Sequence, residues 1–113
     1  MPAPQGFALE VSDAKDGTVG IAVRGELDMS AAPDLAEAIA GARSGDGTVL
    51  LDLSAVTFLD SSAIGALVAA GREFHQTGGR LQIGPRSDVV SRVLEITGLS
   101  EQSDAFDVLP QDG

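Results

Sequence analysis

The chain has 113 residues, which is enough for one compact domain and too few for two. Its formal net charge of −10, from 17 acidic and 7 basic side chains, disfavours binding to nucleic acid or anionic lipid and favours a partner with a basic patch. The sequence has no cysteine, no signal-peptide pattern and no apolar run near the roughly 20 residues that span a bilayer, so we expect a cytoplasmic domain without disulfides, thiolate chemistry or a membrane segment.

The first half of the chain predicts a hairpin, a helix and a central strand. Apolar residues alternate over 7–11 and again over 19–23, with a turn at 13–17, which is typical of an antiparallel hairpin. The segment 30–33 resembles a helix start with a proline in its first turn. The nearly continuous apolar run 49–53 indicates a strand that is covered on both faces.

The second half predicts two helices and two short strands. A helix starts near Asp60 and ends at the glycines of 77–79, where a flexible cap is expected. A short strand at 81–83 precedes a third helix, which Ser87 can cap and Gly98 stops. The segment 105–109 resembles a last edge strand. The apolar positions expected on the buried face of the second helix are Ile64, Leu67, Val68, Gly71 and Phe74.

This order of elements predicts an α/β fold. Strands that alternate with helices form parallel units with right-handed crossovers, and the initial hairpin adds an antiparallel strand. We therefore expect a single domain over 7–110 with a small mixed β-sheet and packed helices. The residues 1–6 and 111–113 are expected to be flexible termini.

The segment Asp60-Ser61-Ser62 is the first candidate site. Asp and Ser accept hydrogen bonds from the free N–H groups at a helix start, so the segment is explained by capping alone. The same position, at the positive end of a helix dipole, also tolerates a phosphate on a serine. Since one side chain suffices as a cap, a second hydroxyl is open to modification.

Two further acidic positions allow alternative interpretations. The segment Gly25-Glu26-Leu27-Asp28 follows the second predicted strand and, taken by itself, is better explained as a solvated acidic turn than as a functional site. Asp52 lies within an apolar strand, where a buried carboxylate would need hydrogen-bond partners. It is also compatible with an outward position near the edge of the sheet.

Other chemistry has little support in the sequence. His75 is the only histidine and is expected at the exposed end of its helix, and without cysteine it predicts no metal site. No phosphate-binding loop pattern occurs, and no Ser-His-Asp set is convincing. Arg80, Arg86 and Arg92 are expected on the surface. We therefore expect a domain that is not an enzyme and needs no metal or cofactor.

Three segments resemble the STAS family of anti-sigma factor antagonists. They are Arg24 to Asp28, which contains Gly-Glu-Leu-Asp; Leu51-Asp52-Leu53-Ser54 through Val56-Thr57-Phe58-Leu59-Asp60-Ser61-Ser62-Ala63-Ile64-Gly65; and Ile96-Thr97-Gly98-Leu99. The second segment is long and specific, whereas the others are weak alone. The sequence departs from the family pattern at Ala63, where glycine is common, and at Ile64, where leucine is common.

The resemblance implies a site and a set of partners. It places the phosphoacceptor at Ser62, with Ser61 as the alternative, and the partner surface at Asp28, Asp60, Ser61, Ser62 and Ile64. The unphosphorylated protein would bind an anti-sigma factor, itself a serine kinase with a histidine-kinase-like fold, and so release a sigma factor. Phosphorylation would end this binding, and a serine phosphatase would restore it.

Two alternatives remain open from the sequence. Family members also include scaffold proteins and transporter-associated subunits, and a shared fold does not decide between these roles. A receiver-like domain that phosphorylates itself on Asp52 is the other alternative. A receiver also needs a lysine after its last strand, and the only lysine here is Lys15, in the early turn.

Overall fold

The computed structural model describes residues 7–12, 16–42, 47–99 and 105–110. Its strands and helices follow the predicted order, and the expected termini 1–6 and 111–113 lie outside the described residues. The elements are β1 (Phe7–Val11), β2 (Thr18–Leu27), α1 (Ala32–Ala42), β3 (Thr48–Leu59), α2 (Ser61–Gln76), β4 (Arg80–Arg86), α3 (Asp88–Ile96) and β5 (Asp107–Val108).

One mixed sheet carries all five described strands in the order β1-β2-β3-β4-β5. β1 pairs with β2 antiparallel, and the other neighbours are parallel, which confirms the predicted sheet. Asp16 and Gly17 turn the hairpin with φ angles of 54° and 79°. Asp and Gly adopt this left-handed conformation more readily than other residues, so the sequence predicts this part of the turn. Residues 13–15 of the predicted turn lie outside the described part.

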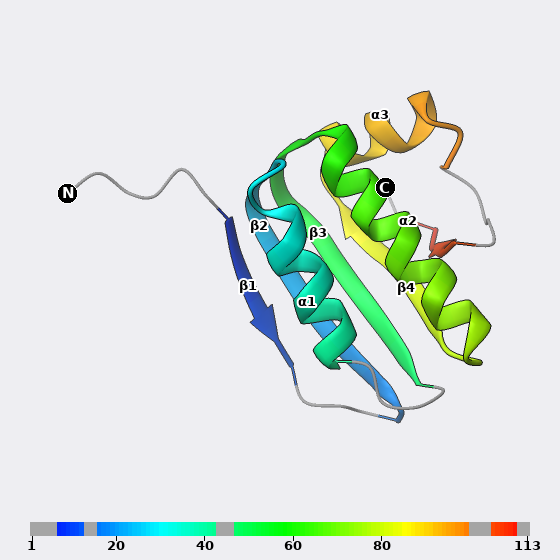
Figure 1. The fold of residues 1–113 in the computed structure, drawn as a ribbon. Coiled ribbons are helices and arrows are strands. Elements are labelled where there is room, and N and C mark those ends of the chain that lie inside the picture. Colours follow the sequence, from blue (N-terminus) through cyan, green and yellow to red (C-terminus); the bar gives the residue numbers. More distant parts are fainter. Residues whose placement is uncertain (1–6, 13–15, 43–46, 100–104, 111–113) are drawn as a thin grey trace.

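The core lies between one face of the sheet and helices α1 and α2, which run side by side across that face (Figure 1). Leu35 and Ile39 of α1 and Leu67 and Phe74 of α2 are buried there, as their helical spacing predicts. The sheet contributes alternate apolar residues, which are Ile21, Val23, Val49, Leu51, Leu53, Leu81 and Ile83.

The opposite face of the sheet is largely open, so the prediction that β3 is covered on both faces was wrong. Leu50 and Asp52 are half-buried, and Ser54 and Ala55 are exposed. The leucines on either side of Asp52 are both directed into the core. A continuous apolar run therefore reflected a strand with one deeply buried face and not two covered faces.

β2 and β3 extend beyond both neighbouring strands at their carboxyl ends. The last pair of β3 with β4 is Leu53 with Arg86, and β1 pairs with β2 only as far as Gly25. Among the described residues, 26–27 of β2 and 58–59 of β3 thus continue as a two-stranded extension. The predicted strands, 19–23 and 49–53, were too short because this extension does not alternate simply between apolar and polar residues.

Two β-bulges in β3 cause this loss of alternation. Ala22 pairs with Asp52 and Leu27 with Leu59, and the register shifts once on each side of Gly25 along this stretch. β3 therefore has two more residues than the part of β2 that it pairs with. A bulge re-aims the side chains that follow it, which explains why Val56 and Leu59 are both buried.

No helix within the described residues is long and apolar enough to cross a membrane.

Candidate functional site

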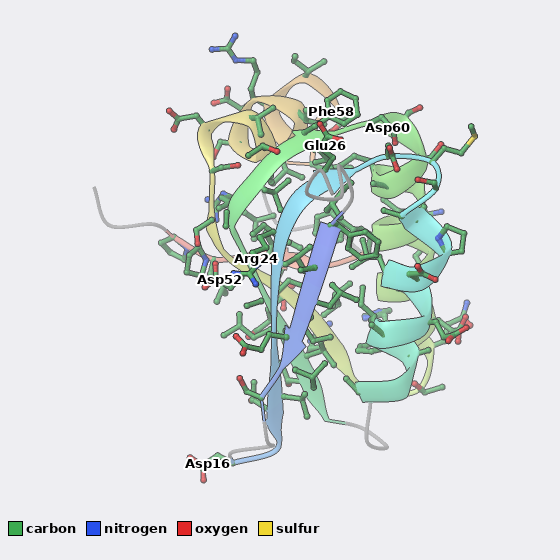
Figure 2. The ribbon with its side chains drawn as sticks, turned by 90° about the vertical axis from the view of Figure 1, so that its left-hand side faces the viewer. Asp16, Arg24, Glu26, Asp52, Phe58 and Asp60 are labelled. Carbon is green, nitrogen blue, oxygen red and sulfur yellow. The ribbon has the colours of Figure 1, made fainter. Side chains whose placement is uncertain are left out.

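The candidate site lies at the end of the sheet where β2 and β3 finish and α1 and α2 begin. We call residues 26–29 and 58–62 the carboxyl rim. A hydrogen bond of 3.2 Å from the Asp60 N–H to the Leu27 carbonyl joins its two halves. Glu26, Phe58 and Asp60 lie together at this end of the molecule (Figure 2). The tertiary structure therefore brings the Gly-Glu-Leu-Asp and Asp-Ser-Ser segments together.

Asp60 caps α2, as predicted. Its backbone is extended, and its Oδ1 accepts a hydrogen bond of 3.1 Å from the Ala63 N–H, while its carbonyl accepts from the Ile64 N–H. The N–H groups of Ser61 and Ser62 have no acceptor within the helix, because they belong to its first turn. The start of α2 therefore presents two free donors and the positive end of a helix dipole.

The hydroxyls of Ser61 and Ser62 form no hydrogen bond with any described residue, and neither serves as the cap. Ser61 is exposed and Ser62 is half-buried. Two other serines that follow an aspartate by two residues differ: Ser30 Oγ donates to Asp28 at 2.7 Å, and Ser54 Oγ donates to Asp52 at 2.6 Å. In those two cases, the serine hydroxyl of the Asp-x-Ser pattern is hydrogen-bonded to the aspartate. At Ser62 the backbone is helical, and the hydroxyl of Ser62 stays free.

Asp28 holds the turn between β2 and α1. Its Oδ1 accepts hydrogen bonds from the N–H groups of Ser30 and Ala31, at 3.0 and 3.1 Å, as well as from the Ser30 hydroxyl. The Ser30 side-chain hydrogen bond, followed by that of the Ala31 backbone, lowers the pKa of Asp28. Only Asp28 of the predicted acidic turn lies in a turn, because Gly25, Glu26 and Leu27 belong to β2.

Asp52 is half-buried on the open face of the sheet and lies far from the end of β3. Its Oδ1 accepts from the N–H and hydroxyl of Ser54, at the first register shift of β3. This carboxylate therefore stabilises a bulge. It also borders a shallow hollow of about 290 Å³ with Arg24, which projects from the same face (Figure 2).

Ile64 does not fit the predicted partner surface. Its side chain is 8% exposed and packs in the core, since it lies on the face of α2 that meets the sheet. The other predicted rim residues, Asp28, Asp60, Ser61 and Ser62, all keep part of their surface exposed.

Several expectations outside the rim can also be compared with the structure. His75 and Arg92 are exposed as predicted, and His75 Nδ1 lies 3.0 Å from Arg80 Nη1. Arg86 is only partly exposed, and its Nη1 donates to the carbonyls of Gly84 and Leu109. Ser87 precedes α3, but its hydroxyl donates to the Val56 carbonyl at 2.6 Å instead of capping the helix.

Two residues of the rim were not identified from the sequence as surface residues. Met29 and Phe58 are large apolar side chains that are 73% and 46% exposed. Met29 could have been recognised from its place in a turn beside Asp28. The exposure of Phe58 depends on the second bulge of β3, for which the sequence has no local signal.

No group of three or more His, Cys, Asp or Glu side chains in the described part of the chain is arranged to hold a metal ion. The side chains that the structure brings together at the rim are carboxylates, hydroxyls and two apolar groups. They can accept a phosphate or contact another protein.

Comparison with known proteins identifies the family. The family model described as "Mlab, STAS domain" matches residues 11–110. An anti-sigma-B factor antagonist of Listeria monocytogenes is 34% identical over 96 residues, which cover 84% of each chain. The crystal structure of an anti-sigma factor antagonist from Mycobacterium paratuberculosis has a TM-score of 0.78 and 30% identity, covering 98% of this chain and 92% of that one.

A third comparison supports the fold alone. The Bacillus cell fate determinant SpoIIAA in its phosphorylated form has a TM-score of 0.65 at 24% identity, over 92% of this chain and 93% of that one. The family model, the sequence relative and the similar structures all agree with the fold described above. The chain belongs to the STAS domain family, of the anti-sigma factor antagonist type.

Proposed function

We propose that this protein binds and neutralises an anti-sigma factor, thereby freeing a sigma factor, and that phosphorylation of Ser62 ends the binding. The role of antagonist is supported by the relatives that carry that name. The observation that carries the switch is the free hydroxyl of Ser62 in the first turn of α2, at the carboxyl rim. The proposed partner surface comprises Asp28, Asp60, Ser61 and Ser62.

A phosphate on Ser62 is compatible with the folded domain. The free N–H groups at the start of α2 and the helix dipole both favour a negative group there. Asp60 opposes it through its negative charge, but its Oδ1 already accepts a hydrogen bond from the Ala63 N–H, which holds this carboxylate in place as the cap. We therefore expect the modification to change the surface of the rim and to leave the fold intact.

The loss of binding follows from the charge that the phosphate adds. A phosphoserine carries about −1.5 to −2 charges at neutral pH. The kinase that modifies Ser62 must hold a nucleotide phosphate opposite it. At about 5 Å and an effective dielectric constant near 20, each pair of like charges costs about 3 kcal/mol, which corresponds to roughly a hundredfold loss of affinity.

The proposed partners are proteins. They are an anti-sigma factor with a histidine-kinase-like serine kinase fold, which binds and phosphorylates the domain, and a serine phosphatase, which restores it. The domain supplies the acceptor hydroxyl and no cofactor. It is proposed to act in the cytoplasm without direct contact with nucleic acid or membrane.

Phosphopeptide mapping tests this function directly. The purified protein is incubated with Mg-ATP and each histidine-kinase-type anti-sigma factor of its source organism. We expect phosphate on Ser62, no phosphate on the Ser62→Ala variant, and undiminished phosphate on Ser61→Ala. Phosphate on Ser61 would reassign the switch, and binding without any phosphate transfer would favour a scaffold role.

Binding measurements with the same variants test the consequence of phosphorylation. Ser62→Ala should bind the anti-sigma factor whether or not ATP is present, whereas Ser62→Asp should bind roughly a hundredfold more weakly, since it adds one negative charge at this position. Equal affinities of Ser62→Asp and the unmodified protein would count against an electrostatic switch.

A further inference from the structure

Large apolar side chains are exposed at four places in the described part of the chain. They are Val11, Met29, Phe58 and Ile96, with exposed fractions of 55%, 73%, 46% and 77%. Two of these four, Met29 and Phe58, belong to the carboxyl rim, where the candidate switch also lies. Val11 is at the opposite end of the hairpin, and Ile96 is at the end of α3.

Phe58 is exposed because the two-stranded extension leaves it without cover. Neither β4 nor the described part of β1 pairs beyond Leu53 and Gly25, so β2 is the only described strand that flanks Phe58. The register shift between Gly25 and Glu26 precedes the pairing of Glu26 with Phe58, and Leu59 is directed into the core. Phe58 therefore faces away from that core, beside Glu26 (Figure 2).

Met29 is exposed because the Asp28 turn holds it there. The carboxylate of Asp28 bonds to Ser30 and Ala31, the residues that follow Met29, and so the backbone on both sides of Met29 is fixed. An apolar side chain on a backbone that is already ordered loses less conformational entropy when it is buried by a partner. Met29 is thus well placed to contribute to binding.

The charges of the rim indicate which kind of partner surface would cover Met29 and Phe58. Glu26, Asp28 and Asp60 belong to the same rim and form no ion pair with a described residue. The whole chain has a net charge of −10, which disfavours a second copy of this protein on the same surface. Exposed apolar side chains on an acidic rim are complemented by apolar pockets bordered by Arg or Lys.

We propose that Met29 and Phe58 are the apolar anchors of the interface with the anti-sigma factor, and that they enter apolar pockets bordered by basic side chains on that protein. This inference rests on the proposed function and assigns the affinity to residues outside the switch itself. Ser62 then controls whether the anchors can engage, by placing charge against the bound nucleotide. The anchors and the switch contribute separately, so they can be tested separately.

The experiment measures the affinity of the unphosphorylated protein for each purified histidine-kinase-type anti-sigma factor, loaded with Mg-ADP, by calorimetry. Truncating a buried interface anchor typically weakens binding by one to two orders of magnitude. We expect about a 30-fold loss for Phe58→Ala and about a tenfold loss for Met29→Ala. Val11→Ala and Ile96→Ala are matched controls, because they remove exposed apolar side chains elsewhere, and should stay within about twofold.

Two further variants separate the contributions of folding and charge. Phe58→Thr places a β-branched residue, which also favours strand conformation, at this position and should lose affinity as Phe58→Ala does, even if the alanine variant is less stable. Glu26→Gln should reduce the salt dependence of binding, because a charge opposite a basic partner is removed. Thermal unfolding of every variant shows which losses arise from unfolding.

The outcomes distinguish the inference from the proposed function. If Met29→Ala and both Phe58 variants match the controls while Ser62→Asp still weakens binding, the inference is overturned and the proposed function stands. If the unmodified protein binds none of the anti-sigma factors, both fail. A salt dependence that is unchanged in Glu26→Gln would overturn the basic border of the proposed pockets.

Discussion

Aspartates followed two residues later by serine stabilise three irregular parts of this backbone. Asp28 holds the turn before α1, Asp52 holds a bulge in β3, and Asp60 begins α2. In each case, one carboxylate oxygen accepts a nearby backbone N–H that the regular ladder or helix leaves unpaired. The local sequence therefore predicts the type of hydrogen bond at these sites, but not whether the serine hydroxyl remains free.

The depressed pKa of Asp28 provides a prediction at this scale. Ser30→Ala removes the side-chain hydrogen bond that contributes most to the shift, so the pKa of Asp28 should rise toward its ordinary value. Because the folded pKa is lowered, the stability from this turn is present above the ordinary pKa and is lost as the pH falls through the lowered pKa.

The measurement is an NMR titration of the Asp28 carboxyl carbon in both proteins. Ser54→Ala is the control, because that hydroxyl binds Asp52 and leaves Asp28 untouched. An unchanged titration of Asp28 in Ser30→Ala would contradict the assigned cause.

At the scale of the elements, α2 combines two glycines with different roles. A Cβ on Gly71 would lie 1.7 Å from the carbonyl oxygen of Ala105, so the chain before β5 packs directly on this helix. A Cβ on Gly65 would meet nothing within 4 Å. Gly71 is required for packing, whereas Gly65 only weakens the helix.

These two glycines predict opposite effects of the same substitution. Gly71→Ala should lower the free energy of unfolding by about 1–3 kcal/mol or more, because backbone atoms must move apart. Gly65→Ala should raise it by up to about 1 kcal/mol, because alanine has the higher helix propensity. Urea unfolding of both variants measures the difference, and equal effects would show that α2 and Ala105 are not in close contact.

At the scale of the whole molecule, the domain has the parts of a phosphate acceptor. The carboxyl rim has the Ser62 hydroxyl and free backbone N–H donors. The receiver-like alternative would instead require Asp52 as the phosphate acceptor. Asp52 lies within β3 and accepts hydrogen bonds from Ser54. A bulge-forming carboxylate on the open face of the sheet is poorly placed to serve the role that we propose for Ser62.

Incubation of the purified protein with Mg-ATP alone is therefore expected to leave its mass unchanged. Intact-mass spectrometry detects one added phosphate, and the same protein with a cognate kinase is the positive control. Phosphate that appears without kinase, and that disappears in Asp52→Asn, would support the receiver-like alternative.

The sequence alone was sufficient to predict the order of the elements, the hairpin, the parallel crossovers and the start of α2 at Asp60. These features depend on local hydrophobic spacing and on capping residues, which are encoded within a few neighbouring positions. The Gly-Glu-Leu-Asp and Asp-Ser-Ser segments were recognised through their resemblance to a family. Their contact at the rim required the parallel pairing of β2 with β3.

Only the tertiary structure decided the length of that pairing and the direction of the side chains beyond it. Two bulges shift β3 against β2, so alternation no longer tells which residues are buried. As a result, Phe58 is exposed beyond the second bulge, whereas helical spacing alone had predicted the burial of Ile64. The tertiary structure also decided that Arg86 donates to the carbonyl of Leu109, which is distant in the chain. The register of paired strands, and the burial of residues beyond a bulge, depend on residues that are distant in the chain, and local patterns therefore cannot determine them.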